Sequence, residues 1–590
     1  MVNSILRGAA STGLVLAAMA AVTPAGAAPA TDGTWTAAPV NPGVGQAFGL
    51  WLLTDGTVLS HGTALNNWVV LSPDAKGSYA NGTWKSVASS MHARGGAQQH
   101  MLRDGRFFQA GGEYIDGPAC TAALCPTTEI YDPVANTWTP TATAQYDIGD
   151  TGSATLADGR VLDSTRTDNH IQIYDPVTDK WTVPGTMPLQ SGDENAWVSL
   201  QNGGVLAVGY QSDGAAIYNP ATGTWIRTGP VPSGFNTGDT GGISLMFDGR
   251  VFVYGLSSQC YIYTPGATAA DPGTWVLGPK MLNNEAEDEF SDTLPNGMVW
   301  GGLVTKTYGP GVVLQQFNPM TNMVSMATPT PDQGNPYPIG YVNLPNGQVM
   351  VTAANANWIY TPNTPPQDAW RPTVTSVVYN SDGSYTLTGT QLSGLINGSD
   401  EGDDMTNAAN YPIVRLQDEA GNVYYCRSFA FSNMMPSKGP TPETCQFTTP
   451  KNLPAGTYEL YVSAVGVQSK DPVSFTTGVG GMGGAADAGT TAADAGGSPG
   501  DSTSGTDGGT SSGGSSSGGG AGGEGSNGGG QATADGGGAA GQGDHATGGS
   551  PPSGCACHAA GNTSRRGLAA WLVLIGLSAA GWRRRRARRG

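Results

Sequence analysis

The sequence predicts an all-β protein in which a seven-bladed β-propeller is followed by a β-sandwich. The main observation is a pattern that occurs seven times: an apolar stretch, a turn of the Asp-Gly or Asn-Gly type, and a second apolar stretch. The turn glycines are Gly56, Gly105, Gly159, Gly203, Gly249, Gly297 and Gly347, separated by 49, 54, 44, 46, 48 and 50 residues. This period is the length of one four-stranded propeller blade. We therefore assign residues 31–370 to a propeller.

The first 30 residues are typical of a secretory signal peptide. Arg7 is followed by an apolar run over residues 11–22 and by a small-residue segment at 25–27. The apolar run is about half the length of roughly 20 residues that a membrane-spanning helix needs. We therefore expect cleavage near Ala27 or Ala30, and an exported protein.

An aromatic motif closes most of the blades. The third strand ends in Tyr-Asp-Pro or a close variant, and the tryptophans that follow it are Trp138, Trp181, Trp225 and Trp275. Proline fixes φ at the turn, and the large aromatic rings fill the wedge between blades. These residues resemble the Kelch repeat. Because Trp35 has no inner strands before it, we expect the N-terminal segment to supply the outermost strand of the last blade and so close the ring.

Residues 371–477 alternate apolar and polar positions in short runs, which predicts a β-sandwich. The acidic segment 402–404 and the strand-like segment 410–416 resemble the immunoglobulin-like domain attached to galactose-oxidase-type propellers. The sandwich loop also carries Asp400, Glu401, Asp403 and Asp404. These acids lack EF-hand spacing, so Asp400, Asp403 and Asp404 are weak candidates for Ca²⁺ ligands.

The C-terminal part of the sequence predicts a tether and a sorting tail. Residues 478–553 are almost entirely Gly, Ser, Ala, Thr and Asp, which predicts a disordered linker with a root-mean-square span of roughly 45–50 Å. Residues 554–590 contain Cys555 and Cys557, an apolar segment at 567–582 and an Arg cluster. This arrangement resembles the myxobacterial C-terminal sorting signal. It implies one short transmembrane helix, processing near the two cysteines and display at the cell surface; a plain tail anchor is the alternative.

The resemblance to galactose oxidase and glyoxal oxidase implies a copper-radical site, but this chain lacks its residues. The family needs a cysteine cross-linked to a tyrosine, a second tyrosine followed by histidine, and a histidine from the C-terminal domain. Gly96 stands at the place of the cross-linked tyrosine, and Pro338 follows Tyr337 where histidine is required. No histidine occurs between His170 and His545. We therefore predict no copper-radical oxidation.

No other catalytic set is evident. The remaining propeller histidines are His61, His92, His100 and His170, and they fall in separate repeats without metal-ligand spacing. Lone histidines on strands are usually packed or solvated side chains.

Acidic residues precede the first strand of four consecutive blades. They stand nine or ten positions before the turn glycines and are Asp150, Asp193, Asp239, Glu287 and Asp288. Equal register places them around one rim of the central channel, where such a ring repels itself unless a ligand meets it. We add Arg94 and Tyr337 as candidate ligand-binding residues, and Tyr146, Trp197, Phe235 and Phe290 as aromatic neighbours that could stack on a sugar. Alternatively, these acids are ordinary solvated loop residues.

Seven cysteines in an exported protein permit disulfides. Cys120 and Cys125 lie in one loop, and Cys426 and Cys445 fall in the sandwich, so we predict the bridges Cys120–Cys125 and Cys426–Cys445. Cys260 is expected to be a buried, inert thiol because nothing basic lies near it in sequence.

Charge and organisation favour a binding protein. The formal net charge is −18, and removal of eight basic residues in the last 26 positions, which hold no acids, makes it −26. Such a body will not bind nucleic acid through phosphates. We expect a monomeric, non-catalytic protein of the cell surface or envelope that binds a glycan, Ca²⁺ or a protein at the acidic rim. The alternatives are a copper-independent, carbohydrate-active enzyme that uses the rim carboxylates, and a purely structural envelope protein.

Overall fold

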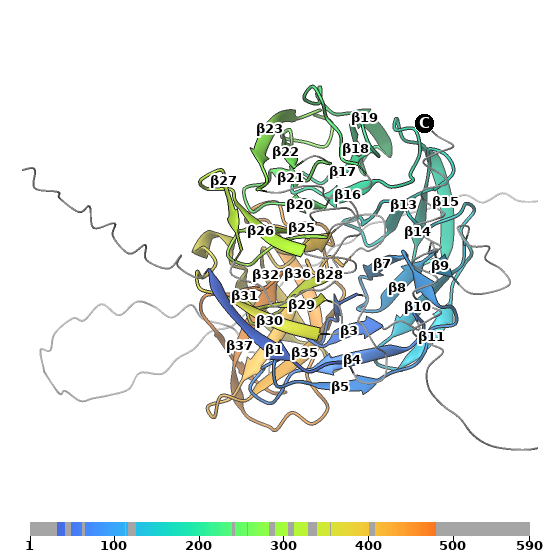
Figure 1. The fold of residues 1–590 in the computed structure, drawn as a ribbon. Helices are drawn as coiled ribbons and strands as arrows, with labels where there is room; N and C mark the ends of the chain where they lie inside the picture. The colour runs from blue at the N-terminus through green and yellow to red at the C-terminus, as the bar shows by residue number, and fades with distance from the viewer. Residues whose placement is uncertain are drawn as a thin grey trace, which may run out of the picture. The chain divides into compact units, whose positions relative to one another are not determined.

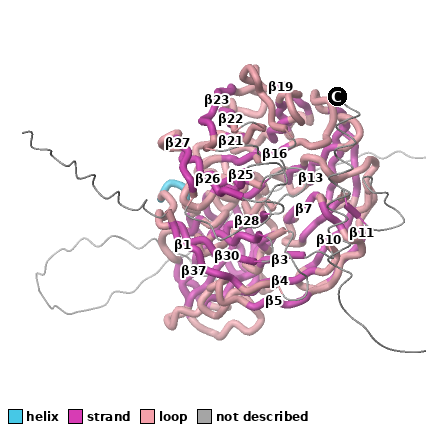
Figure 2. Tube along the Cα trace, in the orientation of Figure 1, coloured by secondary structure: helices cyan, strands magenta, loops and turns pink. Residues whose placement is uncertain are grey.

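The computed structural model of the 590-residue chain is all-β. It describes residues 32–41, 49–61, 65–112, 114–115, 125–238, 242–256, 258–282, 290–304, 312–327, 339–353, 356–400 and 407–478. Within these ranges one short 3₁₀ helix, η1 (Asp368–Trp370), interrupts the strands and loops (Figure 2). No helix in the described ranges is long and apolar enough to cross a membrane. The expected signal peptide, tether and sorting tail lie outside the described residues.

Seven four-stranded antiparallel units follow one another in chain order (Figure 1). Blades 1 to 3 are β2 (Trp51–Leu52), β3 (Val58–His61), β4 (Trp68–Ser72) and β5 (Thr83–Ser86); β7 (Gln98–Met101), β8 (Phe107–Ala110), β10 (Thr128–Asp132) and β11 (Thr137–Pro140); and β12 (Ser153–Thr155), β13 (Val161–Ser164), β14 (His170–Asp175) and β15 (Lys180–Thr186). A small extra sheet beside blade 2 pairs β6 (Arg94–Gly95) with β9 (Tyr114–Ile115).

The later blades repeat this order. They are β16 (Ala196–Ser199), β17 (Val205–Val208), β18 (Ala215–Asn219) and β19 (Thr224–Arg227); β20 (Ile243–Leu245), β21 (Val251–Val253), β22 (Gln259–Thr264) and β23 (Thr274–Lys280); β24 (Ser291–Thr293), β25 (Val299–Val304), β26 (Val312–Asn318) and β27 (Met323–Met326); and β28 (Ile339–Asn343), β29 (Val349–Ala353) and β30 (Ala356–Pro362). The seventh blade is completed by β1 (Gly33–Ala38), which pairs with β30 and sets Trp35 opposite Tyr360. This confirms the predicted seven blades and the predicted closure of the ring.

The repeated turn explains why the sequence period is so clear. In the first blade, Gly56 N–H donates to Leu53 O at 3.0 Å and Leu53 N–H donates to Thr57 O at 2.7 Å. Gly56 has φ +75°, and the other six turn glycines have φ between +78° and +87°. A residue with a Cβ is strained in this left-handed conformation, so glycine recurs at the same place in every blade.

In the structure, the region predicted as a sandwich, residues 371–477, forms one curled sheet. Its strands are β31 (Thr373–Tyr379), β32 (Tyr385–Thr390), β36 (Pro442–Thr448), β35 (Val423–Phe429), β34 (Ile413–Gln417), β37 (Thr457–Ala464) and β38 (Val467–Gln468), in that spatial order, with β39 (Val473–Thr476) beside β37. Strand β35 pairs with β34 through its first half and with β36 through its second half. It therefore joins the two parts of the curled sheet.

The predicted Cys426–Cys445 disulfide is wrong. Both thiols are free and buried. The register of β35 and β36 pairs Phe429 with Gln446, which places Ala430 next to Cys445 and leaves Cys426 four residues away. Four residues of strand span about 13 Å, well beyond the Cα separation that a disulfide allows. Cys125 is disulfide-bonded, whereas Cys120 lies outside the described residues. Cys260 is free and buried, and burial raises its pKa.

The sandwich contacts the turn end of the propeller. Ser428 N–H donates to Thr54 O at 3.2 Å, and Ala430 N–H donates to Arg103 O at 2.7 Å. A short strand of the same domain, β33 (Ser399–Asp400), pairs with the innermost strand β24 of blade 6. The starts of the innermost strands lie at the opposite end of the propeller, and there Asp150 and Asp193 are found.

Candidate functional site

An arginine links the two predicted rim acids that the structure describes. Arg166 Nη2 lies 2.6 Å from Asp150 Oδ2, and Arg166 Nε lies 3.2 Å from Asp193 Oδ1. The three side chains are 7–12% exposed. Asp150 precedes β12, Asp193 precedes β16 and Arg166 follows β13. The ion pairs therefore connect the entrances of blades 3 and 4.

The backbone holds these two entrances together. Thr151 and Asp193 form an isolated antiparallel bridge, and Glu194 N–H donates to Asp150 O at 3.0 Å. Asp150 and Glu194 have φ of +60° and +57°. Left-handed non-glycine residues cost of the order of 1–3 kcal/mol each, and they concentrate at functional sites. The surrounding bridge and ion pairs keep the strained residues in place.

Three carboxylates converge on this point. One oxygen each from Asp150, Asp193 and Glu194 lies within 4.8 Å of the others. With all four groups ionised, the cluster of these acids and Arg166 carries three negative charges and one positive charge, a net charge of −2. Burial raises the pKa of the nearby Asp147, although the Arg166 charge opposes this. We call Asp150, Arg166, Asp193 and Glu194 the mouth cluster.

A polar layer lies next to the mouth cluster, on the first two strands of blade 3 and the innermost strand of blade 2. Thr151 Oγ1 donates to Asp163 Oδ1 at 3.3 Å, and burial raises the pKa of Asp163 well above its ordinary value. His100 contacts Ser153 Oγ at 2.8 Å and Thr155 Oγ1 at 3.0 Å. Burial lowers the pKa of His100 to about 3, so its ring is neutral.

One of the predicted aromatic neighbours is only half-buried. Tyr146, in the loop before Asp150, stacks on His170 with ring centroids 4.9 Å apart, and both side chains are half-buried. Trp197, Phe235 and Phe290 are buried in the blades instead. Their large apolar rings fill the interior, which corrects the expectation that they could stack on a sugar.

Arg94 also lies in the interior. Its Nε bonds Glu129 Oε1 at 3.0 Å, and its Nη1 donates to the carbonyls of Gly111 and Thr127. The Arg94 and Glu129 side chains are 0% and 1% exposed. This corrects the assignment of Arg94 to the rim, because its guanidinium ties together parts of blade 2.

The other predicted site residues cannot be placed here. Asp239, Glu287, Asp288, Tyr337, Asp403, Asp404, Cys555 and Cys557 lie outside the described residues. Of Asp400, the structure describes only the backbone, in β33.

The residues within the described ranges do not form a ligand set that suits copper. The described group of converging ligand atoms contains three carboxylates and no histidine. Both ring nitrogens of His100 contact hydroxyls, and His170 Nδ1 lies 2.9 Å from Asp168 Oδ2. Gly96, which stands at the place of the cross-linked tyrosine, has a left-handed conformation with φ +59°. The sandwich strand that reaches the innermost strand of blade 6 brings serine and aspartate there.

Sequence reasoning missed Arg166 and Glu194. Glu194 directly follows the predicted rim acid Asp193, so its acidic side chain could have been added to the predicted site. Arg166 stands in a loop after the second strand of blade 3, outside the register that the rim acids share. The contact of this loop with two blade entrances could be seen only in three dimensions.

The chain is similar to several proteins of known structure. No family model matches the chain, and no curated protein matches it. A fungal alcohol oxidase of the AA5 family, in complex with copper, shows 16% identity and a TM-score of 0.47, covering 76% of this chain and 100% of its own. The extracellular domain of a one-component system from B. thetaiotaomicron shows 12% identity and a TM-score of 0.40, covering 75% of this chain and 57% of its own. A streptogramin B lyase gives 12% identity and a TM-score of 0.40 over 56% of this chain and 98% of its own.

Proposed function

We propose that this protein is a non-catalytic, exported binding protein whose mouth cluster takes a neutral glycan. The observation that carries the proposal is the Arg166 guanidinium held between Asp150 and Asp193. Sugar hydroxyls both donate and accept hydrogen bonds. Carboxylates supply acceptors and a guanidinium supplies donors, so this cluster offers both kinds of partner within one small area.

Two further features support a glycan. Along the sequence, Tyr146 lies shortly before Asp150, and His170 lies shortly after Arg166. The rings of Tyr146 and His170 are half-buried and stack on each other, and an aromatic face suits the apolar face of a sugar ring. Asp150 and Glu194 are strained before any ligand arrives. A rigid, pre-ordered cluster loses less entropy on binding than a mobile one.

Ca²⁺ is the second candidate, because three carboxylates place oxygens within 4.8 Å of one another. Oxygens that surround one Ca²⁺ at 2.3–2.6 Å lie within about 5 Å of each other. Such an ion would compete with Arg166 for Asp150 and Asp193. We therefore expect Ca²⁺ to bind through rearrangement of Arg166, if it binds alone.

A glycan array with the full exported chain tests the proposal. Positive glycans are titrated calorimetrically in Ca²⁺ and in EDTA, with wild type, Asp193→Asn and Arg166→Met. The matched control is Asp158→Asn, an exposed acid that pairs with Arg160 at the turn end of blade 3. We expect at least tenfold weaker binding for the two mouth variants and no change for the control. No glycan binding by wild type, or equal binding by all four proteins, contradicts the proposal.

The alternative is a copper-independent, carbohydrate-active enzyme. A glycosidase needs one carboxylic acid to protonate the leaving group and a second carboxylate to act as base or nucleophile. Asp150 and Asp193 already bind the same guanidinium, which favours a binding role. Release of reducing sugar from an array-positive glycan, abolished by Asp193→Asn, would favour the enzyme.

We also propose surface display through the C-terminal tail. The Cys-x-Cys segment, apolar stretch and Arg cluster support this location. Mass spectrometry of the mature protein tests it: we expect a C-terminus near Cys555, and an intact tail on the mature protein would contradict the processing.

A further inference from the structure

The outer hairpin of blade 6 carries three methionines within seven residues. Met320 stands in the turn between β26 and β27, and Met323 and Met326 are the first and last residues of β27. These residues are 75%, 65% and 50% exposed. Seven methionines elsewhere in the described ranges are only 0–6% exposed. They are Met101, Met187, Met246, Met281, Met350, Met434 and Met435.

The turn of this hairpin does not depend on the side chain of Met320. Asn318 Oδ1 accepts from the N–H of Met320 at 2.9 Å and from the N–H of Thr321 at 3.3 Å. Asn322, at the end of the turn, is left-handed with φ +55°. The backbone and Asn318 therefore close the turn, and the thioether of Met320 projects into solvent.

The strand after the turn is anchored by its one half-buried residue. β27 pairs with β26 over its whole length. Val324 packs against a buried core cluster that contains Phe252 and Phe317. Met323 and Met326 lie on either side of this anchor and are exposed. A chemical change at their sulfur atoms therefore leaves the packing of the blade intact.

The fold does not require a methionine at the first position of β27. Met323 lies opposite the last residue of the third strand of its blade, Asn318. Polar residues hold the corresponding place in blades 1 to 5. They are Thr83, Thr137, Lys180, Thr224 and Thr274. The exposed thioether is thus a departure of blade 6 from the repeat, and its chemistry distinguishes it from the hydroxyl and ammonium groups of the other blades.

The characteristic reaction of an exposed thioether is oxidation to a sulfoxide. With hydrogen peroxide, the sulfur lone pair attacks one peroxide oxygen, an S–O bond forms and the O–O bond breaks. The proton of the transferred oxygen passes to the departing hydroxide, which leaves as water. Sulfur loses two electrons and the peroxide gains them. The product side chain is polar, whereas methionine is apolar.

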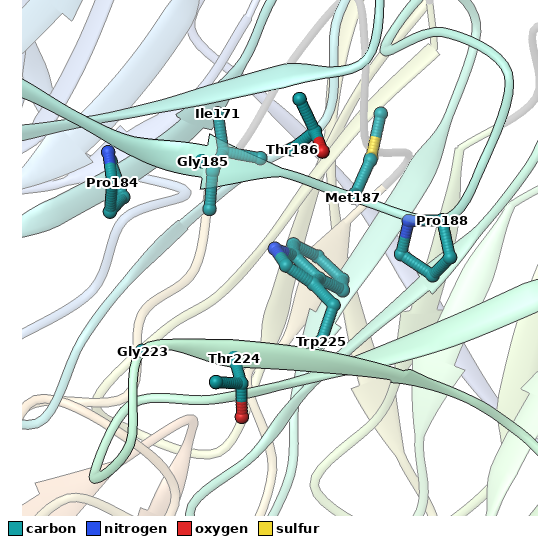
Figure 3. A pocket seen from close by; sticks show the side chains of 9 residues that line it. All are labelled: Ile171, Pro184, Gly185, Thr186, Met187, Pro188, Gly223, Thr224 and Trp225. Carbon is teal, nitrogen blue, oxygen red and sulfur yellow. The ribbon is translucent and has the colours of Figure 1, made fainter.

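Buried methionines provide the contrast within the same molecule. Met246 and Met281 belong to the core cluster against which the hairpin packs. Met187 lies beside Ile171 and Trp225 at the seam between blades 3 and 4, and it is only 1% exposed (Figure 3). Peroxide reaches such side chains only when the structure opens locally. The fold therefore separates reactive from protected methionines.

Shared ligation of a soft metal ion fits the hairpin less well. Thioethers bind Cu(I), but one ion needs sulfur atoms that converge. Met323 and Met326 are three residues apart in a strand, so their side chains point to opposite faces of the blade. We propose that the outer hairpin of blade 6 is a site of methionine oxidation. Its three thioethers react separately with a hydroperoxide, and the edge of the blade becomes more polar while the fold is kept.

The test treats the full chain with hydrogen peroxide and follows each methionine by peptide mapping with mass spectrometry. Far-UV circular dichroism follows the fold, and hydrophobic interaction chromatography follows the surface. The variant combines Met320→Leu, Met323→Leu and Met326→Leu, which keeps apolar side chains and removes the sulfur atoms. The matched control is Met91→Leu, because Met91 is 57% exposed but lies outside the hairpin.

We expect the three hairpin methionines to be oxidised more than about tenfold faster than Met246 and Met281, with an unchanged circular dichroism spectrum. Oxidation should shorten the chromatographic retention of Met91→Leu more than that of the triple variant. In urea, the difference in oxidation rate should disappear.

Equal oxidation rates in the folded protein overturn the proposal, and so does loss of the spectrum before the hairpin is fully oxidised. An equal change in retention for the triple variant and Met91→Leu overturns the change in surface polarity. A rate difference that persists in urea would assign the reactivity to the local sequence instead of exposure, and would also overturn the proposal.

Discussion

Two buried arginines of the propeller form ion pairs of different kinds. Arg94 bonds Glu129 and two carbonyls within blade 2, so its charge and its donors are satisfied inside one structural unit. Arg166 joins acids from two blades, and a third carboxylate, that of Glu194, converges on the same point. Burial alone therefore does not separate a structural ion pair from a candidate site. The convergence of three carboxylates and the strained backbone around the pair do.

The largest expected effect is on the structural pair. Arg94→Met leaves Glu129 buried without its guanidinium, and breaking a buried pair in this way costs about 3–5 kcal/mol. Urea unfolding should show this loss, with binding at the mouth unchanged under native conditions. A loss below about 1 kcal/mol would mean that Arg94 is not needed to hold blade 2 together.

The buried acid Asp292, which is hydrogen-bonded to an amide, can be compared with the acids that pair with buried arginines. Asp292 Oδ1 accepts from Asn343 Nδ2 at 2.9 Å, and burial raises the pKa of Asp292 to about 7. An unfolded Asp has a pKa near 3.9, so the stability from this group is full below about pH 4 and is lost as pH rises through about 7.

The loss approaches about 4 kcal/mol by pH 8 for this pKa difference. His100 contributes in the opposite sense, since its lowered pKa costs stability as pH falls below about 6.5. We therefore compare urea unfolding of wild type and Asp292→Asn from pH 4 to 8. The difference between the two proteins should change between about pH 4 and pH 7 and level off above that; a constant difference from pH 4 to 8 contradicts the raised pKa.

An intermediate effect is expected for Arg166→Met. It removes the guanidinium that pairs with Asp150 and Asp193, at a cost of about 1–3 kcal/mol, and it weakens glycan binding. Adding Asp193→Asn should restore part of the stability because it removes one of the repelling charges. Full additivity of the two substitutions would show that Arg166 and Asp193 are not coupled.

The smallest effect is expected at an exposed pair. Arg106 Nη2 lies 2.7 Å from Asp104 Oδ2, with side chains 33% and 50% exposed. Such pairs contribute about 0–1 kcal/mol because water and salt screen them. Arg106→Met should therefore shift the urea midpoint only slightly; a loss equal to that of Arg94→Met would remove the distinction between buried and exposed pairs.

The repeated parts of the fold could be predicted, because their chemistry is local. A left-handed turn requires glycine at Gly56 and its six counterparts, and an unpaired Trp35 segment requires a partner strand. The mouth cluster could be predicted only in part. Asp150 and Asp193 follow the blade register, whereas Arg166 comes from a loop that has no counterpart in the repeat. Trp197 is the opposite case. Its position in the blade repeat suggested a residue at the rim, but the structure shows that it is buried.

The most direct test of the central claim is a crystal structure of the exported chain with an array-positive glycan. We predict glycan density within hydrogen-bond distance of the Arg166 guanidinium and of the Asp150 or Asp193 carboxylate. Density bound elsewhere on the propeller, with the mouth cluster free of ligand, would contradict the account.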